Sequence, residues 1–527
     1  MSAAGDSSLH GAQLILGLLI AVAALVTIAR RLGIAYPIFL VIGGLILGLV
    51  PGVPRIQVDP DLIFIIVLPP LLYIAGFFTP IQSLRDNLGT VSSLAVGLVI
   101  ASAGAVAVVA HALIPGLPWS AAWVLGAIVA PPDAIAATAI AGRLAVPRQM
   151  VTILEGESLL NDATALTIYS IGLAVAAGVA FSPTTAVVTF VGAMLGGCVI
   201  GVAVGWIVAH VRARIEDTPV EMTISLLTPY AAFLPAQWLD ASGVIAAVAA
   251  GLFLGHRGSR IMGADARLTG RAVWDTISFL LTGLVFIAMG LEAPLVLRAL
   301  TPSLALRMVG IGLTVTLVLI LVRAVWIFGT VALPQHLRGQ SNAFACALVL
   351  SWAGMRGVVS LAAALALPLT LSSGSPFPAR EAIVIVTVTV IVVTLLGQGL
   401  SLPWLIRALQ LGTDVALRQE EGRARQVLVD AALRRLDELD PVWPGHRPLL
   451  EQLRETYRHR SEHVERQRDA SGDGEDQELI EHREIRRTIL DAEREALLRL
   501  RTGGEVNDAL LRNLERELDL EERRMDA

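Results

Sequence analysis

The segment Glu155-Gly156-Glu157-Ser158-Leu159-Leu160-Asn161-Asp162 lies inside an otherwise apolar stretch of the chain. About twenty residues earlier, the segment Ala130-Pro131-Pro132-Asp133-Ala134 carries another acid within an apolar run. A carboxylate at membrane depth is costly unless it is paired, solvated or protonated, so such residues usually have a function. These two segments are therefore predicted to hold the functional site.

The rest of the sequence predicts an all-α polytopic membrane protein. The chain has 527 residues, of which 55% are hydrophobic, and its mean hydropathy is +0.69. Apolar runs of about 17–30 residues recur from Ala12 to about Leu409, and each is long enough to cross a bilayer as a helix. About thirteen spans are expected, at about 12–29, 34–50, 61–78, 90–113, 119–140, 149–179, 184–211, 222–238, 242–256, 272–291, 303–333, 341–369 and 380–409.

Arginine placement predicts the orientation. All 40 basic residues are arginines. With the N-terminus outside, about twelve arginines fall in cytoplasmic loops and about four in outside loops, as the positive-inside rule requires. The first apolar run has no basic residues before it, so it is read as a retained helix and not as a cleaved signal.

The composition changes abruptly near residue 413. The segment that follows holds 29 of the 45 acids and 21 of the 40 arginines. A transmembrane domain is therefore predicted over 1–412, and a charged, mainly helical cytoplasmic domain over 413–527. Solvated helices are the default interpretation of this tail, and a regulatory or dimer-supporting role is the alternative. Matched arginine and acid argue against nucleic-acid binding.

Glycines at four-residue spacing predict close helix packing. The pairs are Gly44/Gly48, Gly192/Gly196, Gly197/Gly201 and Gly201/Gly205. Packing within the chain is the expected use, and an oligomer contact is the alternative.

Helical geometry sorts the polar residues of the acidic segment into two faces. Glu155, Ser158 and Asp162 are spaced i, i+3 and i+7 and so share one face, whereas Glu157 and Asn161 form an adjacent stripe. Upstream, Pro131 and Pro132 are predicted to break the preceding span, because proline removes backbone donors. A broken helix beside a carboxylate-bearing helix is the arrangement that secondary transporters use for ion sites at the midplane.

These groups suit a hard monovalent cation. Asp133, Asp162, the Ser158 hydroxyl and freed carbonyls near Ala130 and Pro131 would provide oxygen ligands, which hard cations prefer. Burial disfavours the charged form of a carboxylate, so a proton can compete with the cation for the same group. Competition at a site that is exposed alternately to each side gives obligatory exchange.

Two arginines also lie in apolar spans. An unpaired Arg356 at that depth would be costly, so a carboxylate partner is expected, with Glu157 the first choice and Glu155 the second. Arg323 is expected to pair or to extend towards the interface.

No enzyme or cofactor site emerges from the sequence. The phosphate loop needs a lysine, which the chain lacks, and no metalloprotease or cysteine-cluster spacing is present.

The sequence resembles the sodium/proton exchangers of the first monovalent cation/proton antiporter family. The resemblance is carried, in order, by Leu68-Pro69-Pro70-Leu71-Leu72-Tyr73, Pro132-Asp133-Ala134, Gly156 to Ala163, Leu227-Thr228-Pro229-Tyr230-Ala231, Gly283-Leu284-Val285-Phe286, Trp352 to Ser360 and Val393 to Leu400. It covers most of the first 410 residues.

The resemblance implies a thirteen-helix inverted-repeat fold, a homodimer in the bacterial inner membrane and an elevator-like movement of a core domain. It also implies Na+ coordination by Asp162, Asp133 and Ser158, with Asn161 steadying the site and Glu157 paired with Arg356. An Asn-Asp pair such as Asn161-Asp162 goes with electroneutral exchange in this family.

Two positions depart from the family pattern. Relatives often carry glutamate at the position of Ile74 and threonine at the position of Pro132. Both differences bear on cation selectivity. Potassium/proton exchange therefore stays open beside sodium/proton exchange, and a cation channel and a membrane sensor are alternatives from other classes.

Overall fold

The computed structural model describes residues 2–502 apart from 33–34, 51–62, 143, 145, 216, 299–301, 335–341, 372–373, 410, 412–414 and 470–476, together with 514, 518 and 521–522. The chain divides into two compact units, Met1–Thr413 and Asp414–Ala527. The described residues are mostly helical and form no strand, apart from one isolated bridge between Thr370 and Pro376.

Helical segments lie over every predicted apolar range. Seven helices of the described chain are long and apolar enough to cross a membrane, and shorter apolar helices cover 36–49, 64–78, 243–258 and 343–352. The all-α polytopic class is thus confirmed, whereas the count of thirteen spans stays a prediction.

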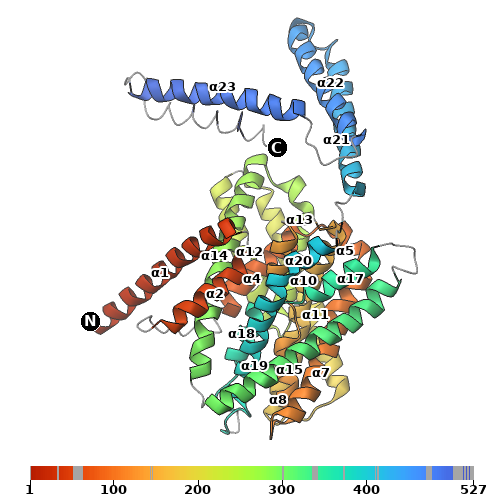
Figure 1. The fold of residues 1–527 in the computed structure, drawn as a ribbon. Helices are drawn as coiled ribbons and strands as arrows, with labels where there is room; N and C mark the ends of the chain where they lie inside the picture. The colour runs from red at the N-terminus through yellow and green to blue at the C-terminus, as the bar shows by residue number, and fades with distance from the viewer. Residues whose placement is uncertain are drawn as a thin grey trace. The chain divides into compact units, whose positions relative to one another are not determined.

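Figure 1 labels most of the helices of the first unit, and we call one group of them, defined by packing among its members, the scaffold bundle. Its members are α1 (Ser2–Leu32), α2 (Tyr36–Leu49), the π-helical turn η1 (Ile63–Val67) with α4 (Leu68–Phe78), α11 (Pro183–Arg212), α12 (Thr218–Trp238), α13 (Gly243–Ile261) and α14 (Ala264–Arg298). The most extensive packing joins α2 to α14, α4 to α13 and α11 to α13.

Glycines allow this close packing. A Cβ at Gly44 would overlap the carbonyl oxygen of Ile287 on α14, and one at Gly201 would overlap that of Ala246 on α13. These glycines therefore serve packing within the chain, as expected.

The other group is called the core bundle. Its first part contains α5 (Ile81–Asp86), α6 (Leu88–Ser92), η2 (Ser93–Leu98), α7 (Val99–Leu113), α8 (Trp119–Val129), α9 (Ala134–Ala141) and α10 (Arg148–Ala176). Its second part contains α15 (Pro302–Ile327), η3 (Phe328–Ala332), α17 (Ala343–Trp352), α18 (Val358–Leu365), α19 (Arg380–Val393), η4 (Thr394–Gln398) and α20 (Gly399–Ala408). Packing between α7 and α15 joins the two parts.

Two spans of the core bundle are interrupted near their middles. The break between α8 and α9 falls at Ala130–Asp133, as the prolines predict, because neither Pro131 nor Pro132 can donate a backbone hydrogen bond. The break between α17 and α18 falls at Ala353–Gly357, where the sequence predicted a continuous span over 341–369. This second break was missed, although Gly354 and Gly357 flank an arginine in an otherwise apolar run.

The second unit contains α21 (Val415–Leu439), a 3-10 turn η5 (Pro444–His446), α22 (Arg447–Asp469) and α23 (Gln477–Thr502). Helices α21 and α22 pack as a hairpin that buries Leu436 and Leu450. The hairpin also carries an ion pair of 2.9 Å between Asp437 and Arg454.

Candidate cation-binding site

The two helix breaks meet and bond to each other. The backbone N–H of Asp133 donates to the carbonyl of Met355 at 2.7 Å, although the two residues lie far apart in the sequence. The Arg356 Nε donates to the carbonyl of Val129 at 3.0 Å, and the Arg356 backbone N–H donates to Thr394 Oγ1 at 3.1 Å. Backbone groups that are freed from helical bonding at membrane depth must find hydrogen-bond partners inside the protein. The contact between the two breaks, which we call the crossing, provides these partners.

Asp133 serves the N-terminal ends of two half-helices. Its Oδ1 accepts from the Ile135 N–H at 2.8 Å, which caps α9, and its carboxylate also accepts from the backbone N–H of Val358 in the first turn of α18. Helix N-termini carry partial positive charge, so this carboxylate lies where its negative charge is stabilised twice. A Cβ at Gly357 would overlap the Asp133 carboxylate, which explains a glycine at the start of α18.

Arg356 lies at the C-terminal ends of the other two half-helices. Besides Val129 it contacts the carbonyls of Ala130, at 3.5 Å, and Gly354. These are the partly negative ends of α8 and α17. The Ala130 carbonyl, expected to be a free cation ligand, therefore faces the guanidinium.

Glu157 pairs with Arg323 of α15. Arg323 Nη1 donates to Glu157 Oε1 at 2.5 Å and Nη2 donates to Oε2 at 2.8 Å, while Nε donates to the carbonyl of Leu350 at 3.1 Å. Both side chains are 1% exposed. The predicted Glu157–Arg356 ion pair is therefore wrong, because carbonyl oxygens at the two breaks satisfy Arg356 and Glu157 pairs with Arg323.

Asn161 fastens the first break to α10. Its Nδ2 donates to the carbonyl of Pro132 at 2.8 Å, and its buried Oδ1 has no hydrogen-bond partner among the described residues. The side chain holds the peptide that precedes Asp133 and does not line the cavity described next. Its position therefore fits the expected steadying role better than direct coordination of a cation, since the bond to Pro132 fixes the peptide that precedes Asp133.

Asp162 and Ser158 line a cavity of about 80 Å³ beside the crossing, together with Pro131, Pro132 and Asp133. We call this space the ion cavity. The structure thus brings the two predicted acids and the predicted hydroxyl into one space. A buried water needs only about 10–15 Å³ in the same measure, so a monovalent cation with a few waters fits. Within the described residues the Asp162 carboxylate makes no ion pair or hydrogen bond, although it is only 8% exposed.

The remaining predicted residues lie outside this cavity. Glu155 is half-buried on α10, does not line the cavity, and forms no ion pair with Arg323 or Arg356. Ile74 packs with Phe77 and Trp274 inside the scaffold bundle. The isoleucine at this position is therefore not in direct contact with the ion cavity, contrary to what its place near the motif suggested.

The scaffold bundle forms the wall opposite the acids. Val67, Leu68, Leu71, Leu72 and Ala75 of η1 and α4 line the cavity from that side. This wall contains no charged side chain, so the core bundle provides the cavity's two carboxylates.

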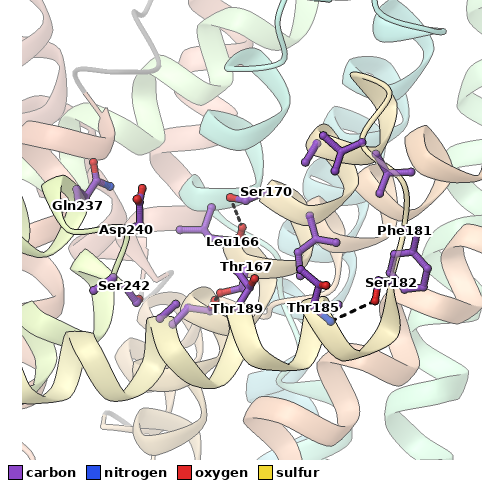
Figure 2. A pocket seen from close by; sticks show the side chains of 18 of the residues that line it. Leu166, Thr167, Ser170, Phe181, Ser182, Thr185, Thr189, Gln237, Asp240 and Ser242 are labelled. Carbon is purple, nitrogen blue, oxygen red and sulfur yellow. Dashed lines mark hydrogen bonds between the residues drawn. The ribbon is translucent and has the colours of Figure 1, made fainter.

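A second, larger cavity of about 530 Å³ lies between α10 and the scaffold helices α11 to α13 (Figure 2). We call it the vestibule. Six of its lining residues carry hydroxyl groups, and Asp240 also lines it. Figure 2 shows these side chains together with apolar ones such as Leu166 and Phe181. Asp240 adopts φ 53° in the turn between α12 and α13, a conformation that few non-glycine residues adopt.

An apolar cluster separates the vestibule from the ion cavity. We call it the seal; its core is Leu68, Leu72, Leu159, Ala163, Phe233, Val244, Ile245, Ala247 and Val248. Leu68 and Leu159 also line the ion cavity, whereas Ala163 and Val244 line the vestibule. The seal therefore lies between the two spaces and consists of residues from both bundles.

Comparison with known proteins agrees with this architecture. The family model described as "Sodium/hydrogen exchanger, transmembrane" matches residues 17–408. An uncharacterised Na+/H+ exchanger of Mycobacterium tuberculosis is 37% identical over 98% of this chain and 96% of its own. The Na+/H+ antiporter ApNhaP of Aphanothece halophytica is 31% identical over 77% of this chain and 76% of its own.

Another relative has a broader cation range in its name. The sodium, potassium, lithium and rubidium/H+ antiporter of Bacillus subtilis is 30% identical over 63% of this chain and 52% of its own. Among solved structures, the sodium proton antiporter MjNhaP1 of Methanocaldococcus jannaschii shares the fold. It has a TM-score of 0.61 at 22% identity, and the match covers 77% of this chain and all of the other. Because the family model matches residues 17–408 and a relative is 37% identical over 98% of this chain, the chain belongs to the sodium/hydrogen exchanger family.

Proposed function

We propose that this protein exchanges Na+ for H+ across the bacterial inner membrane, one for one, with Asp162 as the group that both ions share. The carrying observation is the Asp162 carboxylate, which lines the ion cavity and makes no ion pair or hydrogen bond within the described chain. A buried carboxylate in that situation requires a cation or a proton to neutralise it.

The neighbouring charges support a one-to-one stoichiometry. Arg323 neutralises Glu157, and the N-terminal ends of α9 and α18 stabilise Asp133. One carboxylate is then left whose charge changes during the cycle. If that carboxylate carries one Na+ in one direction and one H+ in the other, the complete cycle moves no net charge.

The seal and the vestibule support alternating access. We place the vestibule at the outer face, with the N-terminus outside and the tail in the cytoplasm. The core bundle would then move against the scaffold bundle in an elevator-like step, opening the seal between α10 and α13. A homodimer held together by the scaffold bundle, which the family resemblance implies, belongs to the same proposal.

The test is cation-induced proton flux in vesicles containing the purified protein, measured with Na+, Li+ and K+ in turn. We expect Asp162→Asn to abolish exchange, because an amide can neither release a proton nor neutralise a cation. Full exchange by Asp162→Asn would remove the basis of the proposal. K+ as the preferred ion would keep the mechanism and change the substrate to that of the alternative, K+/H+ exchange.

Stoichiometry has a separate test. Collapsing the membrane potential with a K+ ionophore should leave the initial rate of Na+/H+ exchange unchanged if no net charge moves. A strong dependence of the rate on the imposed potential would exclude one-to-one exchange, and currents far above slow turnover would indicate a channel.

A further inference from the structure

The scaffold wall of the ion cavity begins with the π-helical turn η1, which precedes two prolines in α4. Pro69 and Pro70 lie in the first turn of α4, after Leu68, and carry no backbone N–H. In an α-helix the N–H of residue 70 would donate to the carbonyl of Ile66, four residues earlier. Pro70 therefore leaves that carbonyl without its α-helical donor.

A side chain from another helix supplies the missing donor. The Tyr230 hydroxyl, on α12, donates to the carbonyl of Ile66 at 2.9 Å. The bond links two segments 164 residues apart in the sequence. η1 is one of four π-helical turns in the described chain, and it leads directly into the cavity wall.

The position of this turn affects the fit of the cavity around its cation. Val67, the last residue of η1, and Leu68, the first of α4, both line the cavity that Asp162 and Ser158 line from the opposite side. The same turn packs against α18, whose first N–H binds Asp133. A shift of η1 would therefore change the cavity's width and press on the helix that holds the second acid.

We infer that Tyr230 is a positioning residue for cation exchange, whose hydroxyl replaces the backbone donor that Pro70 lacks and so fixes the wall of the ion cavity. The inference rests on the proposed function, since it assumes that the cation binds at Asp162. Tyr230 does not line the cavity, and it acts through the backbone of η1.

The deciding variant is Tyr230→Phe, which removes one hydroxyl and keeps the ring. We expect a several-fold rise in the apparent KM for Na+ with little change in maximal rate, because a misplaced wall weakens the fit of the cation throughout the cycle. The matched control is Tyr169→Phe on α10, whose buried hydroxyl has no hydrogen-bond partner within the described chain. It should leave KM unchanged.

A suppressor separates positioning from a general packing role. Pro70→Ala restores a backbone N–H that can reach the Ile66 carbonyl, so the double variant Tyr230→Phe/Pro70→Ala should recover a KM near that of Pro70→Ala alone. A structural role of the hydroxyl elsewhere would give no such recovery. Thermal unfolding of each variant in detergent shows that the folded protein is being compared.

The inference is overturned if folded Tyr230→Phe exchanges Na+ with the wild-type KM, or if a folded double variant keeps the full defect. Should Pro70→Ala fold poorly, the comparison of Tyr230→Phe with Tyr169→Phe still decides. If the proposed function itself were wrong, the result would be distinguishable, because the wild-type protein would then show no exchange that Asp162→Asn abolishes.

Discussion

Apart from Asp162, the buried charges around the cavity each have a counterpart, and the kind of counterpart differs from one to the next. Arg323 meets a carboxylate, Arg356 meets carbonyl oxygens, and Asp133 meets backbone N–H groups. Asp162 is the acid of this group that lacks a counterpart among the described residues. A site that must take up and release a cation benefits from this arrangement, because the transported ion completes the charge balance.

The Glu157–Arg323 pair predicts a specific double-mutant result. Arg323→Ala should destabilise the protein by about 3–5 kcal/mol, because it leaves Glu157 charged in a dry interior. Adding Glu157→Ala should recover part of that loss. Thermal unfolding in detergent measures both effects.

The control for this cycle replaces Arg323→Ala with Arg356→Ala. Since Arg356 is held by carbonyls, Glu157→Ala should add to its defect and not relieve it. Relief with Arg356 and none with Arg323 would show that the pairing first expected from the sequence operates in the membrane.

The crossing of the two broken helices is the element that assembles the site. It places two N-terminal ends at Asp133 and two C-terminal ends at Arg356. The backbone bond from Asp133 to Met355 joins the breaks directly. The crossing is therefore expected to move as one piece when the core bundle moves.

Gly357 tests this arrangement. A Cβ at this position would overlap the Asp133 carboxylate, so Gly357→Ala should displace the acid from the first turn of α18 and strongly reduce Na+/H+ exchange. Gly397→Ala on η4 is the matched control, since its Cβ meets no atom within 4 Å. Proton flux in vesicles should separate the two variants, and equal activity would contradict the proposed position of Asp133.

How far the sequence predicts these elements depends on whether the signal is local. The break at Pro131–Pro132 was predictable because proline acts on its own helix. The partners of Arg323 and Arg356 were not, because they depend on which carbonyls a second break brings close. Gly354 and Gly357 did indicate the second break, but the apolar run over 341–369 was long enough to be read as one continuous span.

The first unit as a whole consists of two bundles that meet at the ion cavity, the seal and the vestibule. Its long apolar runs predicted the helical class, and glycines at four-residue spacing predicted close helix packing within the chain. The structure shows such packing where Gly197 and Gly201 of α11 meet α13. The division into two bundles could not be predicted from periodicity, because helices that are apolar on all sides have no pattern that identifies which face packs against which neighbouring helix. The tail adds a separate helical unit with charged surfaces.

The separateness of the tail predicts that it is dispensable for exchange. A variant that ends at Leu411 should keep measurable Na+/H+ exchange in vesicles, because the ion cavity, both helix breaks and the seal lie in the first unit. Its pH dependence can change if the tail regulates transport. Complete loss of exchange in a folded, membrane-inserted truncation would assign the tail an essential role and favour the sensor alternative.

The double use of Asp133 affects how variants of this protein should be distributed in a genetic screen. Substitutions at Asp162 remove a group that holds no helix in place, so they should yield protein that is present at normal abundance in the membrane but does not transport. Substitutions at Asp133 also release two helix ends, so many should disappear through degradation before transport is assayed. Selecting inactive clones for normal abundance should therefore enrich Asp162 over Asp133, although both acids line the same cavity.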